Sequence, residues 1–259
     1  MKSTSCPRLF LLLALVFFTS GASGLYAQTR TVTRVAAVGT ASYFVLDDGA
    51  LYEAGSSFRG NVGGPRSIST GVKEVFAGPQ SVFFLKTDGT LWALGSNNSG
   101  EFGNGTQTRA DQPIQVAADV VSVAPGSNHT LFLKADATLW AAGSNDRGQL
   151  GTGQTGSRPS LTPIQVASEV RAIAAGQQSS FFIKTDGSLW GMGYNPYGAF
   201  GIGQNSGSTD YASPLKLGSN ASTISVIFYT AVRISILRAI WLRYKYFWST
   251  RSYPRLCFL

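Results

Sequence analysis

The strongest constraint in this 259-residue sequence is an internal repeat. Three segments align along their whole length from Val72, Val120 and Val170: VKEVFAGPQSVFFLKTDGTLWALGSNNSGEFGNG, VVSVAPGSNHTLFLKADATLWAAGSNDRGQLGTG and VRAIAAGQQSSFFIKTDGSLWGMGYNPYGAFGIG. A degenerate copy begins near Val32. Successive copies start 40, 48 and 50 residues apart. Periods of this size are typical of propellers and solenoids.

Each copy is predicted to contain four short strands. In the second copy, residues 82–86 are apolar and aromatic, Asp88-Gly89 signals a two-residue type I′ turn, and residues 91–94 return as the paired strand. A further strand precedes this hairpin, and residues 113–116 supply a fourth. Four strands per copy predict an all-β fold of propeller blades. The aromatic residues expected to pack between neighbouring sheets are Tyr52, Trp92, Trp140 and Trp190.

Glycine and charge are distributed unevenly along the chain. Residues 28–226 hold 28 of the 30 glycines, a density that favours a turn-rich β protein. The formal charge of +8 arises at the two ends, because residues 28–226 contain 13 basic and 13 acidic residues. The neutral central section gives no indication of an anionic ligand, so we expect no nucleic-acid partner.

The amino-terminal segment is predicted to be a secretory signal peptide, residues 1–27. Lys2 and Arg8 precede an apolar run over residues 9–18, and small residues lead to a cleavage site after Ala27. The alternative is an uncleaved anchor, but a run of ten residues is too short to span a bilayer. We therefore expect a secreted or cell-envelope protein with no membrane span after cleavage, and without disulfides in the central section.

The residues after each predicted hairpin complete a resemblance. GSNNSGEFG (95–103), GSNDRGQLG (143–151) and GYNPYGAFG (193–201) resemble the G-x-N-x-x-G-Q-L-G signature of the regulator of chromosome condensation repeat family. The resemblance implies a β-propeller, seven-bladed in the best-known members, that presents loops for protein recognition. The family includes a nuclear exchange factor and secreted bacterial propellers, and the signal peptide favours the secreted type. The first copy departs from the signature, since Ser57 replaces the asparagine.

The repeats are predicted to occupy residues 28–226, with units starting near 32, 72, 120 and 170 and a fifth begun near 214, which makes an incomplete propeller of the seven-bladed type. Residues 227–259 form a basic, aromatic tail without the repeat pattern. Some of the codons that can encode residues 243–252, when read one nucleotide forward, encode G-T-N-T-F-G-Q-L-G. This text matches the repeat signature, which favours a frameshift or truncation. The alternative is a genuine tail that binds a membrane surface or nucleic acid.

Sequence patterns for catalysis or cofactor binding are weak, and we expect no catalytic, cofactor-binding or metal-binding residues and no cofactor. His129 is the only histidine, and its equivalents in the neighbouring copies are Ser81 and Ser179, which favours a hydrogen bond that holds one blade together. Residues 151–156 match G-x-G-x-x-G, but Pro159 prevents the helix that a dinucleotide site requires. The recurrent aspartates are interpreted as turn residues: Asp48, Asp88, Asp136 and Asp186.

Partner recognition is expected in the loops, where the copies differ. The candidate partner-binding residues are Phe58, Arg59, Asp146, Arg147, Tyr194 and Tyr197. Aromatic and arginine side chains are typical of binding hot spots, and ordinary loop variation is the alternative. The sequence thus predicts a non-catalytic, secreted protein-recognition module with a protein partner of unknown identity. The alternatives are a secreted propeller lyase or hydrolase, or a structural surface array.

Overall fold

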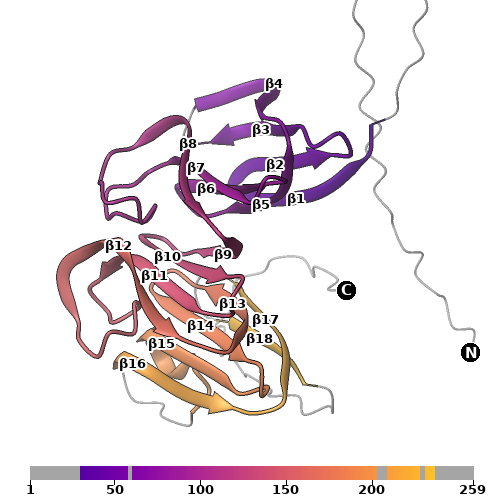
Figure 1. Ribbon diagram of the computed structural model, residues 1–259. Helices are drawn as coiled ribbons and strands as arrows, with labels where there is room; N and C mark the ends of the chain where they lie inside the picture. Colours follow the sequence, from indigo (N-terminus) through magenta and orange to yellow (C-terminus); the bar gives the residue numbers. More distant parts are fainter. Residues whose placement is uncertain (1–29, 58–59, 203–208, 228–230, 237–259) are drawn as a thin grey trace, which may run out of the picture.

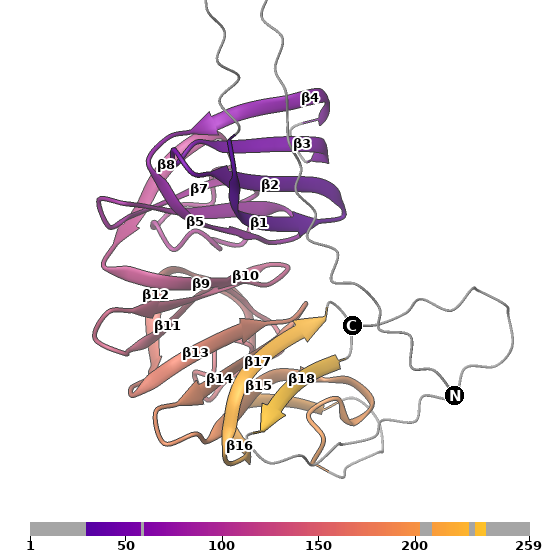
Figure 2. The same ribbon diagram turned by 90° about the vertical axis from the view of Figure 1, so that its right-hand side faces the viewer.

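The fold is all-β, with four antiparallel four-stranded sheets followed by a two-stranded sheet. The computed structural model describes residues 30–57, 60–202, 209–227 and 231–236. The sheets succeed one another in chain order along an arc, from the indigo first sheet to the yellow fifth (Figures 1 and 2). The predicted four-blade arrangement of the repeats is therefore confirmed.

Each blade is a meander in which consecutive strands pair. The first blade contains β1 (Val32–Val38), β2 (Thr40–Leu46), β3 (Leu51–Ser57) and β4 (Gly60–Ser69). The second contains β5 (Val72–Ala77), β6 (Ser81–Lys86), β7 (Thr90–Gly95) and β8 (Ala110–Ala118). The third contains β9 (Val120–Pro125), β10 (His129–Lys134), β11 (Leu139–Asn145) and β12 (Gly156–Ala167). The fourth contains β13 (Val170–Ala175), β14 (Ser179–Lys184), β15 (Leu189–Asn195) and β16 (Thr209–Gly218).

The fifth sheet begins later than the sequence suggested. The segment near residue 214, expected to open a fifth unit, lies in β16, which pairs with β15 and completes the fourth blade. The fifth sheet instead contains β17 (Ala221–Ile227) and β18 (Ala231–Ile236). Strand β18 lies within the segment predicted to depart from the repeat, and residues 237–259 of that segment lie outside the described residues.

The first strand of every sheet lies innermost around a shared axis. Residues at the carboxyl ends of β1, β5, β9, β13 and β17 line one pocket of about 440 Å³. Its lining is mostly alanine and glycine, with Pro125 and Val226 as the larger side chains. Small residues at this point let five backbones converge on one channel, which is the geometry of a propeller.

The turn between the second and third strands of each blade differs from the prediction. Among the residues at this turn in the second blade, only Gly89 has a positive φ, +83°, and its N–H donates to the Lys86 carbonyl over 3.1 Å. Asp88 Oδ1 accepts the N–H of Thr90 over 3.0 Å. The connection is therefore a three-residue loop ending in one left-handed residue, because the aspartate side chain stabilises this alternative to a type I′ turn.

Apolar side chains from adjacent blades form the core. Tyr43 and Leu51 of the first blade pack with Val75 and Phe84 of the second, and the Trp92 ring lies against this cluster. Similar clusters join the second blade to the third around Trp140 and the third to the fourth around Trp190. The tryptophans therefore pack between sheets, as predicted, and most stabilisation comes from burial between blades.

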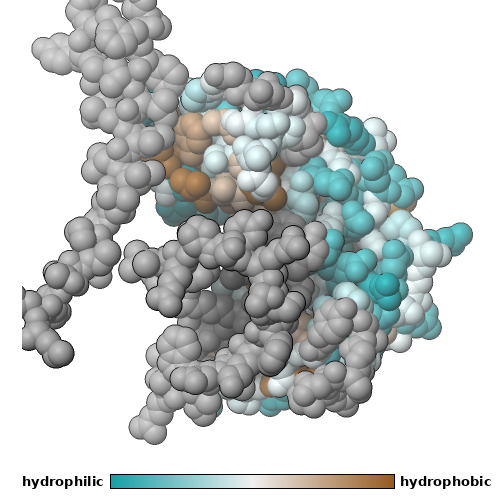
Figure 3. Space-filling view, turned by 180° about the vertical axis from the view of Figure 1, so that it is seen from behind, coloured by the Kyte–Doolittle hydropathy of each residue, from teal (hydrophilic) through white to brown (hydrophobic). Residues whose placement is uncertain are grey.

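The outer face of the first blade has the same residue types but no neighbouring blade among the described residues. Val35 is 65 % exposed, whereas Val75, its equivalent in the second blade, is 5 % exposed. Phe44 stacks on Tyr52 with ring centroids 5.7 Å apart, as Phe84 stacks on Trp92 at the first joint. Figure 3, which views the molecule from behind, shows apolar surface over the first sheet. The described blades therefore form an open arc.

Candidate recognition surface

The connections between the third and fourth strands are organised by a buried asparagine in the second, third and fourth blades. Asn145 Oδ1 accepts the N–H of Leu150 over 3.0 Å, and its Nδ2 donates to the Gln154 carbonyl over 2.8 Å. Asn97 and Asn195 repeat the first bond over 2.9 and 2.8 Å. We call these three connections the asparagine loops, residues 96–109, 146–155 and 196–208, of which 203–208 lie outside the described residues.

The asparagine loops of the second and third blades pack on the blade that follows them. In the third blade, the Gly153 N–H donates to the Ala212 carbonyl of β16 over 2.9 Å. Gly148 has a φ of +79°, and a Cβ added there would lie 2.5 Å from the Ala212 Cα. The signature glycine is therefore required both by its backbone conformation and by close approach to the next blade.

Two of the predicted binding residues are brought together across the joint between the third and fourth blades. The guanidinium carbon of Arg147 lies 4.9 Å from the ring centroid of Tyr194. Arg147 Nη1 also lies 3.4 Å from Asp210 Oδ2, and these two side chains are 45 % and 30 % exposed. We call Arg147, Tyr194 and Asp210 the joint cluster. It presents a cation, an aromatic ring and a carboxylate on one accessible surface.

The structure describes the other four predicted binding residues only in part. Asp146 is exposed beside Arg147 in the same loop. The backbone of Tyr197 lies in the short 3₁₀ helix η1 (Pro196–Gly198). Phe58 and Arg59 lie outside the described residues. Asp210 is the member of the joint cluster that the sequence did not suggest, because it is contributed by the next blade's fourth strand.

A buried polar cluster in the first blade was also missed. Glu53 is fully buried, and its carboxylate accepts bonds from Arg66 Nη2 over 2.6 Å and from the Tyr43 hydroxyl over 3.2 Å. Burial alone would raise the pKa of Glu53, but hydrogen bonds from Ser57, Arg66 and Tyr43, with the Arg66 charge, hold it below its ordinary value. The sequence did contain a signal for this cluster, because Glu53 stands where the other copies have Ala93, Ala141 and Gly191.

His129 joins two blades instead of holding one together, which corrects the expectation from the sequence. Its Nε2 lies 2.9 Å from Ser180 Oγ on β14, and both residues are fully buried. Ser180 Oγ donates to the Gln149 carbonyl over 2.7 Å, so His129 Nε2 is the donor in this pair. Desolvation lowers the pKa of His129 to about 4, despite an opposing hydrogen bond to the Ser179 backbone. The histidine is therefore neutral when folded.

The recurrent aspartates occupy turns, as predicted. Asp136 Oδ1 accepts the N–H and the hydroxyl of Thr138 over 3.0 and 2.6 Å, and the hydroxyl bond is the main reason that its pKa lies below the ordinary value. The lysines that end each second strand have a contact that the sequence did not suggest. Lys86 and Lys134 place their Nζ atoms 4.3 and 4.4 Å from the ring centroids of Trp92 and Trp140.

Among the described residues, no three histidine, cysteine, aspartate or glutamate side chains gather as metal ligands would. The G-x-G-x-x-G segment at residues 151–156 leads into strand β12 and not into a helix. Within the same described part of the chain, no helix has the length and apolar character needed to cross a bilayer.

Fold and surface together define a β-propeller in which structured loops between the third and fourth strands of the second and third blades pack on the following blade. Models of the regulator of chromosome condensation (RCC1) repeat match residues 88–133 and 136–183, and a second model of this repeat matches residues 120–149 and 170–199. Residues 88–199 of the chain are therefore similar to regulator of chromosome condensation repeats. A comparison with curated protein sequences gives no match.

Solved structures show the same fold. Prp20p from Saccharomyces cerevisiae, described with its binding properties to Gsp1p and histones, is similar with a TM-score of 0.66 at 19 % identity, over 76 % of this chain and 54 % of that one. Yeast RCC1 (Prp20) in the structure with bound Kap60 gives 0.68 at 20 % identity, over 76 % and 52 %. Human WBSCR16 gives 0.64 at 19 % identity, over 75 % and 55 %. The chain thus spans about half the length of these propellers, and the likeness concerns the fold.

Proposed function

We propose that this chain is an exported, non-catalytic protein-recognition module that binds its partner through the asparagine loops. The observation that carries the proposal is the joint cluster, in which Arg147, Tyr194 and Asp210 converge from two blades on an accessible surface. Arginine and tyrosine are enriched among residues that dominate binding energy. Proteins of similar fold bind other proteins, since Prp20 is described with Gsp1p, histones and Kap60.

The geometry of the joint cluster suits recognition because its members are already positioned. Arg147 is held between the Tyr194 ring and Asp210, and the loop behind it is fixed by buried Asn145. Less side-chain entropy is then lost when a partner binds. The cluster offers both a charged group and an aromatic face, which favours a partner protein with an acidic or mixed polar surface.

The binding test compares matched alanine variants. Arg147→Ala and Tyr194→Ala are each expected to weaken capture of a partner from the medium of the producing organism by about tenfold or more. The control removes a similar exposed ion pair at the opposite end of the blades, through Arg30→Ala, whose guanidinium lies 2.8 Å from Asp48. Captured proteins are quantified by mass spectrometry. Equal loss in all three variants, or no loss in any, would contradict a role for the joint cluster.

The export test concerns residues 1–29, which lie outside the described residues. Expression of the whole chain in a secreting host is expected to give mature protein beginning at Gln28, read by mass spectrometry of the intact product. A product that retains residues 1–27 and stays inside the cell would contradict export.

A further inference from the structure

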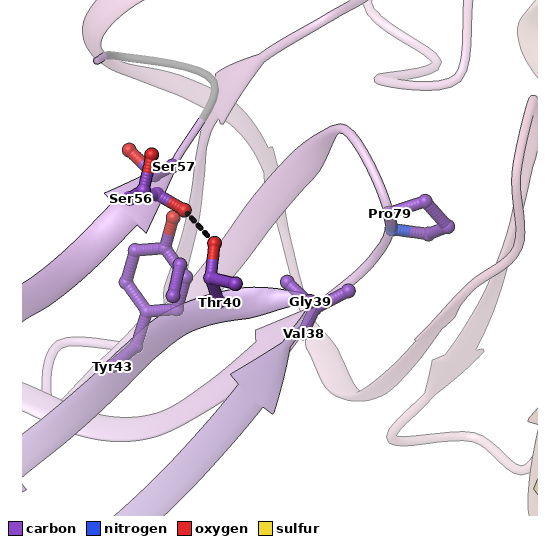
Figure 4. A pocket seen from close by; sticks show the side chains of 8 residues that line it. Val38, Gly39, Thr40, Tyr43, Ser56, Ser57 and Pro79 are labelled. Atoms are coloured by element: carbon purple, nitrogen blue, oxygen red, sulfur yellow. Dashed lines mark hydrogen bonds between the residues drawn. The ribbon is translucent and has the colours of Figure 1, made fainter. Parts of the chain in front are cut away.

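The two faces of the first blade have different surroundings. One face meets the second blade at a joint where Tyr43, Ser57 and Pro79 line a pocket of about 400 Å³ (Figure 4). The other face carries Val35, which is 65 % exposed, and no blade among the described residues covers it. We call this second face the open face.

The open face carries two parallel rows of side chains, because residues directly opposite one another in paired antiparallel strands project from the same face. The first row crosses all four strands and consists of Val35, Phe44, Tyr52 and Ser67. The second row lies two residues along the strands and consists of Ala37, Ser42 and Ala54. We call them the high row and the low row, because three members of the first are large and all members of the second are small.

The equivalent rows of the second blade are buried at the first joint. Val75, Phe84 and Trp92 correspond to the large residues of the high row, and the first two are 5 % and 0 % exposed. Val82 and Leu94 occupy the equivalent of the low row and are fully buried. The open face therefore keeps the large residues of one row but has shorter side chains in the other.

The open face is also uncharged. No member of either row carries a charge at neutral pH. Arg34, which precedes Val35 in the chain, is directed to the second blade, where its Nε donates to Glu74 Oε2 over 2.8 Å. Two copies of this face can therefore meet without electrostatic repulsion, whereas a charged partner surface would have no complementary group there. An apolar face of this kind marks an interaction surface.

The described residues at the far end of the arc offer no matching apolar surface. The exposed described residues of β17 are Thr223 and Ser225, which are small and polar. Packing their hydroxyl groups against Val35 and two aromatic rings would bury polar groups without hydrogen-bond partners. A second open face is therefore a better match than the far end of another copy.

We propose that the open face binds the open face of a second copy of this chain. A two-fold axis between the two sheets, parallel to the rows and midway between them, places the high row of each copy over the low row of the other. The sheets would then stack about 10 Å apart, as in β-sandwiches. This contact goes beyond the proposed recognition function and is independent of the joint cluster, which lies between the third and fourth blades.

Sedimentation velocity of the whole chain measures the association. Four paired strands span roughly 20 by 20 Å, a small interface, so a dissociation constant on the order of 10–100 µM is expected, with mostly monomer at about 1 µM. A protein that stays monomeric at about ten times this constant would overturn the proposal. Species that keep growing with concentration would also overturn it, because a two-fold contact stops at two copies.

A charge introduced into the high row tests the site. Val35→Lys is expected to weaken dimerisation by about tenfold or more, because each ammonium group would be buried against the other copy. Val121→Lys is the matched control, since Val121 is 51 % exposed on β9 and its equivalents are Lys73 and Arg171. Circular dichroism establishes that each variant is folded. Equal dissociation constants for the two variants would overturn the site.

The low row distinguishes a specific fit from unspecific association. Ser42→Val combined with Ala54→Leu introduces the residue types of the second blade at these positions. The double variant is more apolar, so unspecific association would become stronger. In the proposed dimer the longer side chains collide with the other copy's high row, and a dissociation constant about tenfold higher is expected. Ala54→Leu alone provides this test if the double variant does not fold. Unchanged or tighter association would overturn the proposed arrangement.

Discussion

At the scale of single residues, the repeat makes it possible to compare one position in different copies. The residue that ends the loop between the second and third strands has φ values of +78°, +83°, +63° and +81° in the four blades. Three of these residues are glycines and one is Ala137. An L-residue in this conformation brings its Cβ close to the backbone, so the third blade carries a local conformational cost that the other blades avoid.

Ala137→Gly is expected to stabilise the protein by about 1 kcal/mol, since it removes this cost. The reverse change, Gly89→Ala, is expected to destabilise it by about 1 kcal/mol. Gly89 is a clean control because an added Cβ would meet no atom within 4 Å, so the effect reports backbone conformation alone. Urea unfolding of both variants measures the difference. Shifts of the same sign would contradict the explanation.

His129 predicts a pH dependence. The histidine has a pKa of about 4 when folded, against an ordinary value of 6.5, so between these values the unfolded chain binds a proton that the folded chain does not. Its contribution is complete above pH 6.5 and falls by about 3 kcal/mol as the pH drops to 4. His129→Ser, which introduces the residue of the second and fourth copies, should flatten this part of the stability profile. Parallel profiles for the two proteins would contradict a buried neutral histidine.

At the scale of elements, one side chain decides whether a connection becomes a structured loop or a short turn. Asn97, Asn145 and Asn195 lie at the third signature position and bond to the backbone five residues ahead. Ser57 lies at the same position, and there the chain forms a hairpin. The asparagine satisfies buried backbone groups that a serine is too short to reach in the same way.

Asn145→Ala is expected to cost about 1–3 kcal/mol, because the Leu150 N–H loses its buried acceptor. Hydrogen exchange over residues 146–154 should become faster, while the hairpin of β10 and β11 stays protected. Asn98→Ala, at an exposed asparagine of the preceding loop, serves as the control with little expected change. Unaltered exchange in Asn145→Ala would show that the loop is held by other contacts.

At the scale of the whole molecule, stability depends on joints between blades. The same strand position is buried at a joint in Val75 and open to solvent in Val35. Identical residues therefore differ in energetic value according to whether a neighbouring blade covers them. The apolar stack of Phe44 on Tyr52 belongs to this open face. Exposed apolar surface of this type also favours association.

This difference can be measured directly. Val75→Ala is expected to destabilise the protein by about 2 kcal/mol, since two buried methyl groups are lost and a cavity remains. Val35→Ala is expected to change stability by about 0.5 kcal/mol or less. Thermal unfolding of the two variants under the same conditions provides the measurement. Equal losses would mean that Val35 is covered in solution, for example by self-association, which sedimentation would detect.

Much of the architecture followed from local sequence signals. The repeat period, the apolar strands and the turn residues are properties of neighbouring positions, so the sequence alone predicted four blades and the packing of Trp92, Trp140 and Trp190. The turn type was predicted incorrectly, because the bond from the Thr90 N–H to Asp88 selects a three-residue loop. The start of the fifth sheet was also misplaced, since strand pairing assigns β16 to the fourth blade.

The candidate sites depended more on tertiary structure. Arg147 and Tyr194 could be named because they vary between copies, but their contact, and the part played by Asp210, arise only when two blades pack side by side. Likewise the substitution of Ser57 was evident in the sequence, whereas its place beside Pro79 of the next blade in one pocket arises only from the packing of the first two blades. Local hydrogen bonding and hydrophobic periodicity determined each blade. Only packing between blades decided which side chains meet, because the residues concerned are about 20 to 60 positions apart and no local pattern relates them.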